Sequence, residues 1–137
     1  MIIPPAAAAN FCKSVYKTEV IKMETGLFIK KLPQSAVIDL KDIITIEEQQ
    51  VSSLTLVQRP NLAMTLLSLD KGSSIGGHSS PGDAMVNILS GQAEITIGED
   101  KYTVHAGETL VMPANIPHAL HATVAFQMLL VVVKPDK

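Results

Sequence analysis

The sequence has 137 residues, of which 47% are hydrophobic, so its length fits one domain with a sizeable core. Its 13 acidic and 11 basic residues are spread along the chain and give a formal net charge of -2, so we expect no binding to nucleic acid or to a membrane surface. Cys12 is the only cysteine, which excludes an intrachain disulfide and a multi-cysteine zinc site and favours a cytoplasmic location.

The chain begins with an apolar stretch that contains Pro4 and Pro5 and has no basic region ahead of it. This stretch is shorter than the roughly 20 residues that a membrane-spanning helix needs. We interpret residues 1–35 as an N-terminal arm, either poorly ordered or swapped onto a partner chain, and residues 36–137 as the folded domain. One helical turn is expected at residues 39–43.

From Val51 onward the pattern changes to short apolar or alternating runs separated by turn residues, which predicts an all-β domain. Ser90 and Gly91 have the composition of a tight turn, and Gly98 begins a second turn between two strands of a hairpin. The predicted strands are residues 51–57, 62–69, 84–89, 92–97, 101–104 and 126–133.

The last predicted strand, residues 126–133, is apolar on both faces. One face is expected to fill the interior of the domain, and the other must be covered by more protein. Two alternatives remain open, because either the chain before Val51 folds back over that face or a second copy covers it in a homodimer.

Two of the four histidines stand among glycines and prolines at a recognisable spacing. His78 lies between Gly72 and Gly91, and His118 follows Gly107 and Pro113. These two stretches resemble the paired motifs of the cupin superfamily, GxxxxxHxHxxxExxxxxxG and GxxxxxPxGxxHxxxN. The resemblance covers about residues 62–133 and implies a cupin fold, the double-stranded β-helix or jelly-roll antiparallel barrel.

The departures from these motifs matter for function. Ser80 stands at the position of the second histidine of the first motif, and Ala84 stands at the position of its glutamate. In the second motif Asn115 replaces the glycine, a mild change because asparagine tolerates a left-handed backbone, and Ala122 replaces the final asparagine.

The resemblance implies a site for one divalent metal, such as zinc, nickel, iron or manganese, inside the barrel. Superfamily members with complete motifs hold the ion with three imidazoles and a carboxylate, whereas here only His78 and His118 match. Further candidate donors are Asp83, His121 and Gln127. If Ala84 faces the interior, strand alternation turns Asp83 away from it, and His121 points to the face opposite His118.

The pocket around this site is expected to include Ser80, Ala84, Met64 and Met112. His105 is interpreted as a surface or interface imidazole. Three hypotheses remain: a cupin that binds a small molecule through His78 and His118, a metal-dependent enzyme of the oxygenase or isomerase type with a reduced ligand set, and a non-catalytic structural or regulatory dimer.

Overall fold

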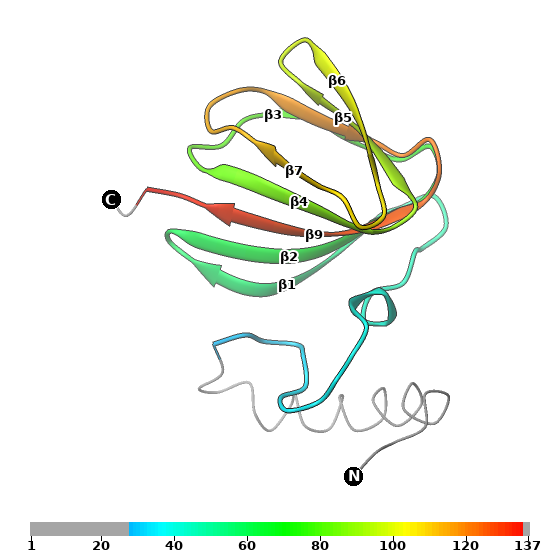
Figure 1. Cartoon of the computed structure of the whole chain (residues 1–137), viewed down its shortest axis with the longest axis vertical. Helices are drawn as coiled ribbons and strands as arrows, with labels where there is room; N and C mark the ends of the chain where they lie inside the picture. Colours follow the sequence, from blue (N-terminus) through cyan, green and yellow to red (C-terminus); the bar gives the residue numbers. More distant parts are fainter. Residues whose placement is uncertain (1–27, 136–137) are drawn as a thin grey trace.

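The computed structural model describes residues 28–135, and the regular elements of this part of the chain are antiparallel β-strands apart from one short 3-10 turn (Figure 1). The predicted all-β class is therefore confirmed. Within the described residues, no helix has the length and hydrophobicity needed to cross a bilayer. The elements are η1 (Leu40–Asp42), a single 3-10 turn, followed by β1 (Val51–Arg59), β2 (Leu62–Leu69), β3 (Ser74–His78), β4 (Asp83–Ser90), β5 (Gln92–Ile97), β6 (Asp100–His105), β7 (Thr109–Met112), β8 (His118–His121) and β9 (Phe126–Val133).

The strands form two sheets that face each other. One has five strands in the order β1-β2-β9-β4-β7, and the other has four in the order β3-β8-β5-β6. Strand alternation directs one face of each sheet inward, where buried apolar side chains from both sheets make a common core. Its members include Leu69, Val86, Ile95, Leu120 and Phe126. The last strand, β9, is the central strand of the larger sheet.

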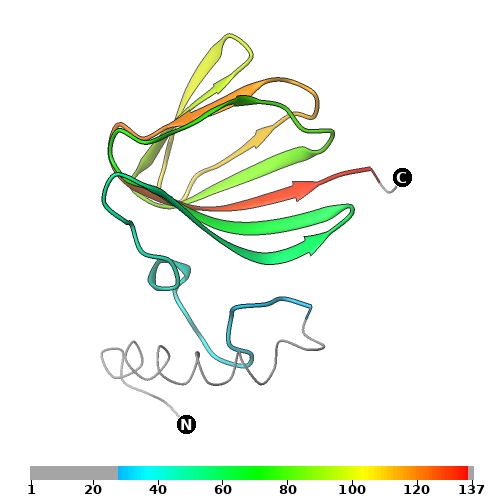
Figure 2. The same ribbon diagram turned by 180° about the vertical axis from the view of Figure 1, so that it is seen from behind.

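The outer face of the five-stranded sheet carries a second apolar cluster. Leu56 and Leu66 from β1 and β2 pack there with Ile44, which belongs to the segment before β1. Figures 1 and 2 both show this segment, with η1, below β1 and outside the two sheets. The alternative in which the chain before Val51 folds back over the outer face is thus confirmed for the part of that face that the segment reaches.

A row of polar side chains fastens this segment to the sheet. Ser68, Gln127 and Ser90 lie side by side on β2, β9 and β4. The amide nitrogen of Gln127 donates to the carbonyl oxygens of Lys41 at 2.8 Å and Ile44 at 2.6 Å. The hydroxyl of Ser90 donates to the Gln127 amide oxygen at 2.7 Å, and the hydroxyl of Ser68 donates to a segment carbonyl. The buried Gln127 amide is therefore satisfied by the protein itself.

The covering segment leaves part of the outer face open. Met85, Val111 and Val133 are 37%, 50% and 56% exposed, and the register places Met64, Val131, Met85 and Val111 in one row across four strands. The predicted homodimer, which would cover such a row, stays a prediction. So does the boundary between an arm of residues 1–35 and the domain, because most of that arm lies outside the described residues.

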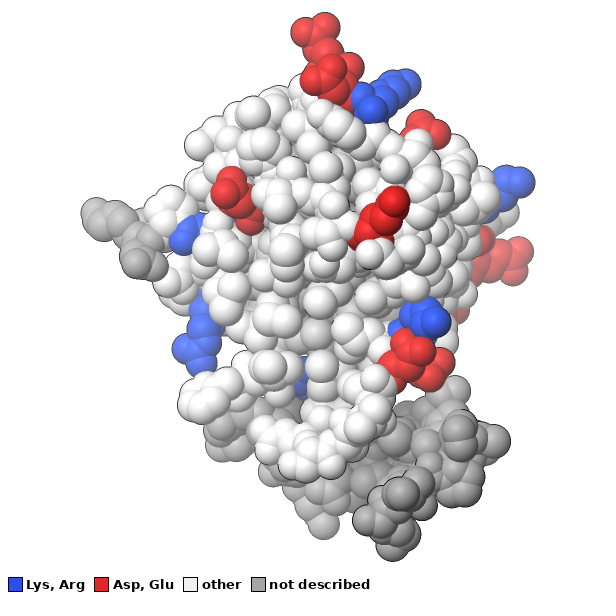
Figure 3. Space-filling view, in the orientation of Figure 1, with Lys and Arg blue, Asp and Glu red and all other residues white. Residues whose placement is uncertain are grey.

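Charged side chains do not gather into a large patch on the face that Figure 3 presents, where acidic and basic groups stand singly or in small groups of mixed sign. This arrangement agrees with the even spread of charge along the sequence.

Candidate functional site

Strands β3 and β8 bring two histidines into contact at one end of the two-sheet structure. His78 is the last residue of β3 and His118 is the first residue of β8, and the strand register pairs them directly. Their rings meet edge to face, with centroids 4.7 Å apart and planes at 77°. His118 is buried and His78 is exposed, so the pair runs from the interior to the surface.

An irregularity in β3 puts His78 on the inner face. Ile75 pairs with Leu120 and packs against the core, so a regular strand would turn a residue three positions later to the opposite face. The register shifts by one residue between Ile75 and His78, which is a β-bulge at Gly76 and Gly77. This extra residue restores the inward direction. Sequence reasoning missed this role of the two glycines, although the odd spacing between Ile75 and His78 was a signal for it.

The two loops that carry the motif residues are tied to each other. Asn115 adopts a left-handed backbone with φ of 65°, which confirms that asparagine stands in for the motif glycine. Its N–H donates to the carbonyl oxygen of Ser80 at 2.7 Å, and the N–H of Ala114 donates to the carboxylate of Asp83 at 2.8 Å. The loop before β8 is thereby fixed against the loop after β3, which holds His118 beside His78.

The hydrogen bond made by His118 determines which ring nitrogen faces the site. Its Nδ1 lies 3.3 Å from the carbonyl oxygen of Ile116. A carbonyl oxygen only accepts, so Nδ1 carries the hydrogen and Nε2 keeps a free lone pair in the neutral ring. Nε2 of His118 is therefore available to accept a hydrogen bond or to bind a cation.

The surroundings of His118 favour this neutral form. Burial lowers the pKa of His118 below its usual value, and the charge that His78 acquires on protonation lowers it further. The bond to the Ile116 carbonyl acts in the opposite direction and is the smallest of the three effects. A ligand that enters from solvent near neutral pH therefore meets an uncharged imidazole at His118.

The facing sheet supplies an apolar wall at the same end of the molecule. Ala84, at the start of β4, pairs with Met112 on β7 and with Val132 on β9, and all three side chains belong to or pack against the inner core. Ala84 presents a methyl group at the position of the motif glutamate. We call this end of the two-sheet structure, where β3 ends and β4 begins, the mouth; it has the two imidazoles on the four-stranded sheet and the apolar side chains of Ala84, Met112 and Val132 on the five-stranded sheet.

Of the predicted pocket residues, Ala84 and Met112 lie in the inner core. Met64 was predicted wrongly, because it packs in the outer cluster. In β2 the inward residues are Leu67 and Leu69, so alternation turns Met64 outward. The hydroxyl of Ser80 is engaged with the backbone of Gly82, where it shapes its own loop.

The three additional metal donors considered from the sequence do not join the histidine pair. Asp83 faces outward, as alternation with buried Ala84 requires, and its carboxylate holds the Ala114 N–H. His121 is exposed on the opposite face of β8 and contacts the Ser74 hydroxyl at 2.6 Å. Gln127 lies between the inward Phe126 and Met128, so it faces outward and binds the covering segment.

The donor set therefore does not fit the metal site that the complete motifs describe. Within residues 28–135, no group of three or more His, Cys, Asp or Glu side chains is placed to hold a metal ion. A durable site for zinc or a similar divalent ion usually takes three or four protein ligands, and here two imidazoles converge. The remaining motif positions hold the loop-bound Ser80 and the methyl group of Ala84.

Two facing antiparallel sheets with a histidine pair at their mouth define a small all-β protein of the jelly-roll class. The cupin domain family matches residues 65–134, just over half of the chain. The chain belongs to the cupin family, which confirms the resemblance found in its two motifs.

Solved structures of related proteins agree with this assignment. A conserved protein of unknown function from Streptococcus pyogenes is 58% identical with a TM-score of 0.79, covering 81% of this chain and 97% of its own. A cupin superfamily protein from Desulfitobacterium hafniense is 31% identical with a TM-score of 0.75, covering 78% of this chain and 98% of its own. In sequence alone, the chain is also similar to an uncharacterized protein from Streptomyces coelicolor, at 28% identity over 84 residues, which is 61% of this chain and 80% of that protein.

Proposed function

We propose that this protein binds a small molecule at the mouth between its two sheets, with His78 and His118 as the polar anchors. The observation that carries the proposal is the contact between an exposed and a buried imidazole, 4.7 Å apart, facing an apolar wall. Mostly apolar sites with a few convergent polar groups are the usual form of small-molecule sites.

The chemistry of the two walls indicates the class of ligand. Nε2 of neutral His118 accepts a hydrogen bond, so it favours a hydroxyl or an amide N–H as the donor. The wall formed by Ala84, Met112 and Val132 favours an apolar body next to that group. A small alcohol or amide with a short hydrocarbon part satisfies both walls.

The metal-dependent enzyme of the oxygenase or isomerase type is the second hypothesis, and the two-imidazole donor set is evidence against it.

The third hypothesis, a structural or regulatory homodimer, is supported by the exposed side chains of Met85, Val111 and Val133. Sedimentation of the wild-type chain and of Val111→Lys tests that dimer, since a charge in the apolar row would separate the two copies. The cytoplasmic location stays a prediction.

The test combines metal analysis with ligand titration. Protein purified without a chelator or a histidine tag is analysed for metal before and after incubation with iron, manganese, nickel, zinc and copper. Hexanol and hexanamide are then titrated into the metal-free protein near neutral pH, and the histidine side-chain nitrogens are followed by NMR. The variants are His78→Ala and His118→Ala, with His105→Ala and His121→Ala as matched imidazole controls outside the mouth.

We expect hexanol or hexanamide to shift the Nε2 signal of His118 in the wild type without any metal, and to leave that signal unshifted in His78→Ala. In His118→Ala the His78 signals should not respond to either probe, while both controls should keep the His118 shift. Stoichiometric metal that disappears in His78→Ala and His118→Ala would overturn the metal-independent proposal in favour of the enzyme hypothesis. No response of either mouth histidine to either probe would also count against ligand binding there.

A further inference from the structure

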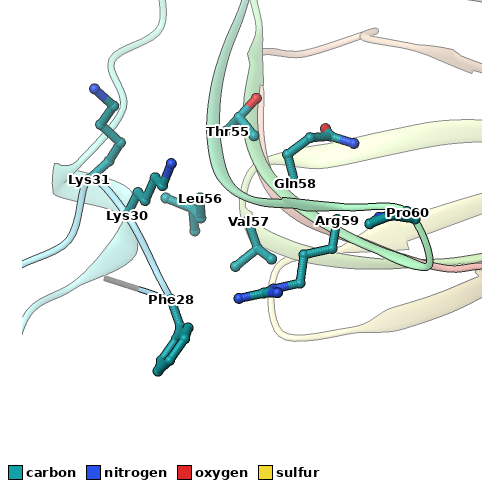
Figure 4. A pocket seen from close by; sticks show the side chains of 9 residues that line it. All are labelled: Phe28, Lys30, Lys31, Thr55, Leu56, Val57, Gln58, Arg59 and Pro60. Atoms are coloured by element: carbon teal, nitrogen blue, oxygen red, sulfur yellow. The ribbon is translucent and has the colours of Figure 1, made fainter. Parts of the chain in front are cut away.

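A separate cavity lies outside the two-sheet core, at the edge of the five-stranded sheet (Figure 4). One wall is the segment of residues 28–31, and the other is the end of β1 with the turn that follows it. The N–H of Lys30 donates to the carbonyl oxygen of Leu56 at 2.8 Å and joins the two walls. The cavity volume is about 580 Å³, which lies within the range of small-molecule sites.

The charge of this cavity differs from that of the whole chain. The lining includes Lys30, Lys31 and Arg59, and none of the described residues that line it is acidic, whereas the chain has a formal net charge of -2. Lys30 and Arg59 come from opposite walls (Figure 4). Among residues 28–135, the ion pairs of the structure involve neither Lys30 nor Arg59. Two cations that face one gap without an acidic partner attract an anion.

An apolar surface accompanies these charges. Phe28 is 76% exposed at the rim, and the Arg59 guanidinium lies 5.6 Å from the centroid of its ring. Pro60 lines the cavity from the other wall. An exposed aromatic side chain held beside a guanidinium offers contact area for a hydrocarbon group next to a bound anion.

We propose that this cavity binds a small organic anion, a carboxylate or a phosphate ester with a short apolar group. The guanidinium of Arg59 forms paired hydrogen bonds with the anionic head, and the ammonium of Lys30 approaches it from the other wall. Phe28 and Pro60 contact the apolar part. The site is independent of the mouth between the sheets and shares no residue with it.

The test titrates octanoate into the full-length, metal-free protein and follows backbone amides by NMR. Octanol serves as the neutral counterpart and inorganic phosphate as the head group alone. The variants are Lys30→Gln and Arg59→Gln, with Lys101→Gln as an exposed lysine on β6 outside the cavity. His118→Phe removes the anchor of the mouth, so that binding at the two sites is distinguished.

We expect octanoate to perturb the amides of residues 28–31 and 55–59, with affinity that falls as salt is added. Each cavity variant should weaken binding by about tenfold, while Lys101→Gln and His118→Phe leave these perturbations unchanged. The proposal is overturned if Lys30→Gln and Arg59→Gln bind octanoate like the wild type, or if the perturbations map only to the mouth. Equal binding of octanol or of inorganic phosphate would also overturn it.

Discussion

The imidazole rings of His78 and His118 are in contact across β3 and β8 because β3 contains one residue more than β8 in the stretch that leads to the histidine pair. The bulge at Gly76 and Gly77 compensates for the odd number of steps between Ile75 and His78. The candidate site therefore depends on the length of β3 as well as on its histidine.

Deletion of Gly77 should remove the bulge and still leave the histidine on the inner face. It would then follow Ile75 by two residues, as His118 precedes Leu120 by two, so a regular β3 would keep the two histidines paired. Deletion of both Gly76 and Gly77 should instead place the histidine directly after Ile75, on the opposite face, and abolish the edge-to-face contact. Nuclear Overhauser contacts between the two rings measure this, and we expect them to persist in the single deletion and to vanish in the double deletion. Loss of the contact in the single deletion would show that the bulge and strand alternation do not set the direction of His78.

The pKa of His118 predicts a pH dependence of stability. Because the pKa is lowered in the folded state, the unfolded chain binds a proton at a higher pH than the folded chain. The part of the unfolding free energy that depends on a neutral His118 is fully present above the usual pKa of 6.5. It is lost as pH falls through the window between that value and the lower pKa of the folded state. Urea unfolding at a series of pH values measures it, and His118→Phe should flatten this part of the profile. An unchanged slope in His118→Phe would contradict the assignment, while His121→Ala should keep the slope.

Gln127→Leu should loosen the segment that covers the outer face. The substitution leaves the carbonyl oxygens of Lys41 and Ile44 without their donor, at a cost of about 1–3 kcal/mol in unfolding free energy. Hydrogen exchange of residues 41–46 should accelerate more than exchange in β5 and β8. Gln92→Leu on β5 is the control, and equal protection of the segment in both variants would refute the role of Gln127.

Gly91→Ala should be strongly destabilising. Gly91 has a φ of 73°, and an added Cβ would collide with the carbonyl oxygen of Ala125 and approach the Phe126 Cα to 3.0 Å. A loss of about 2 kcal/mol or more is expected in chemical denaturation. Gly107→Ala separates the two causes, since Gly107 has a φ of 88° but no atom within 4 Å of the added Cβ. Gly107→Ala should lower the free energy of unfolding less than Gly91→Ala does. An equal loss in the two variants would mean that the backbone angle alone causes the destabilisation.

The sequence predicted the long strands and the motif residues because their signals are local. Alternation and turn composition were sufficient to place β1, β2 and β9, and the requirement for a left-handed residue explained Asn115. Alternation from Ala84 also gave the outward direction of Asp83 correctly.

The errors concern which face of the larger sheet a residue occupies. Met64 and Gln127 were candidates for the interior, yet both lie under or beside the covering segment. Both faces of β2 and β9 bear apolar side chains, so hydrophobicity alone does not distinguish inside from outside there. The bulge in β3 is likewise a property of the pairing between strands, which the sequence of one strand does not contain.

The position of β9 also has a consequence for how the protein is made. The larger sheet is completed around its central strand, β9, which pairs with β2 and β4 and leaves the ribosome after both of them. During synthesis the edges of β2 and β4 that pair with β9 stay unpaired, and the apolar side chains of the unfinished sheet stay exposed, until residues 126–133 emerge. Chains that end before Phe126 should consequently aggregate or be degraded, and nascent full-length chains should be most dependent on chaperones in the interval before β9 inserts.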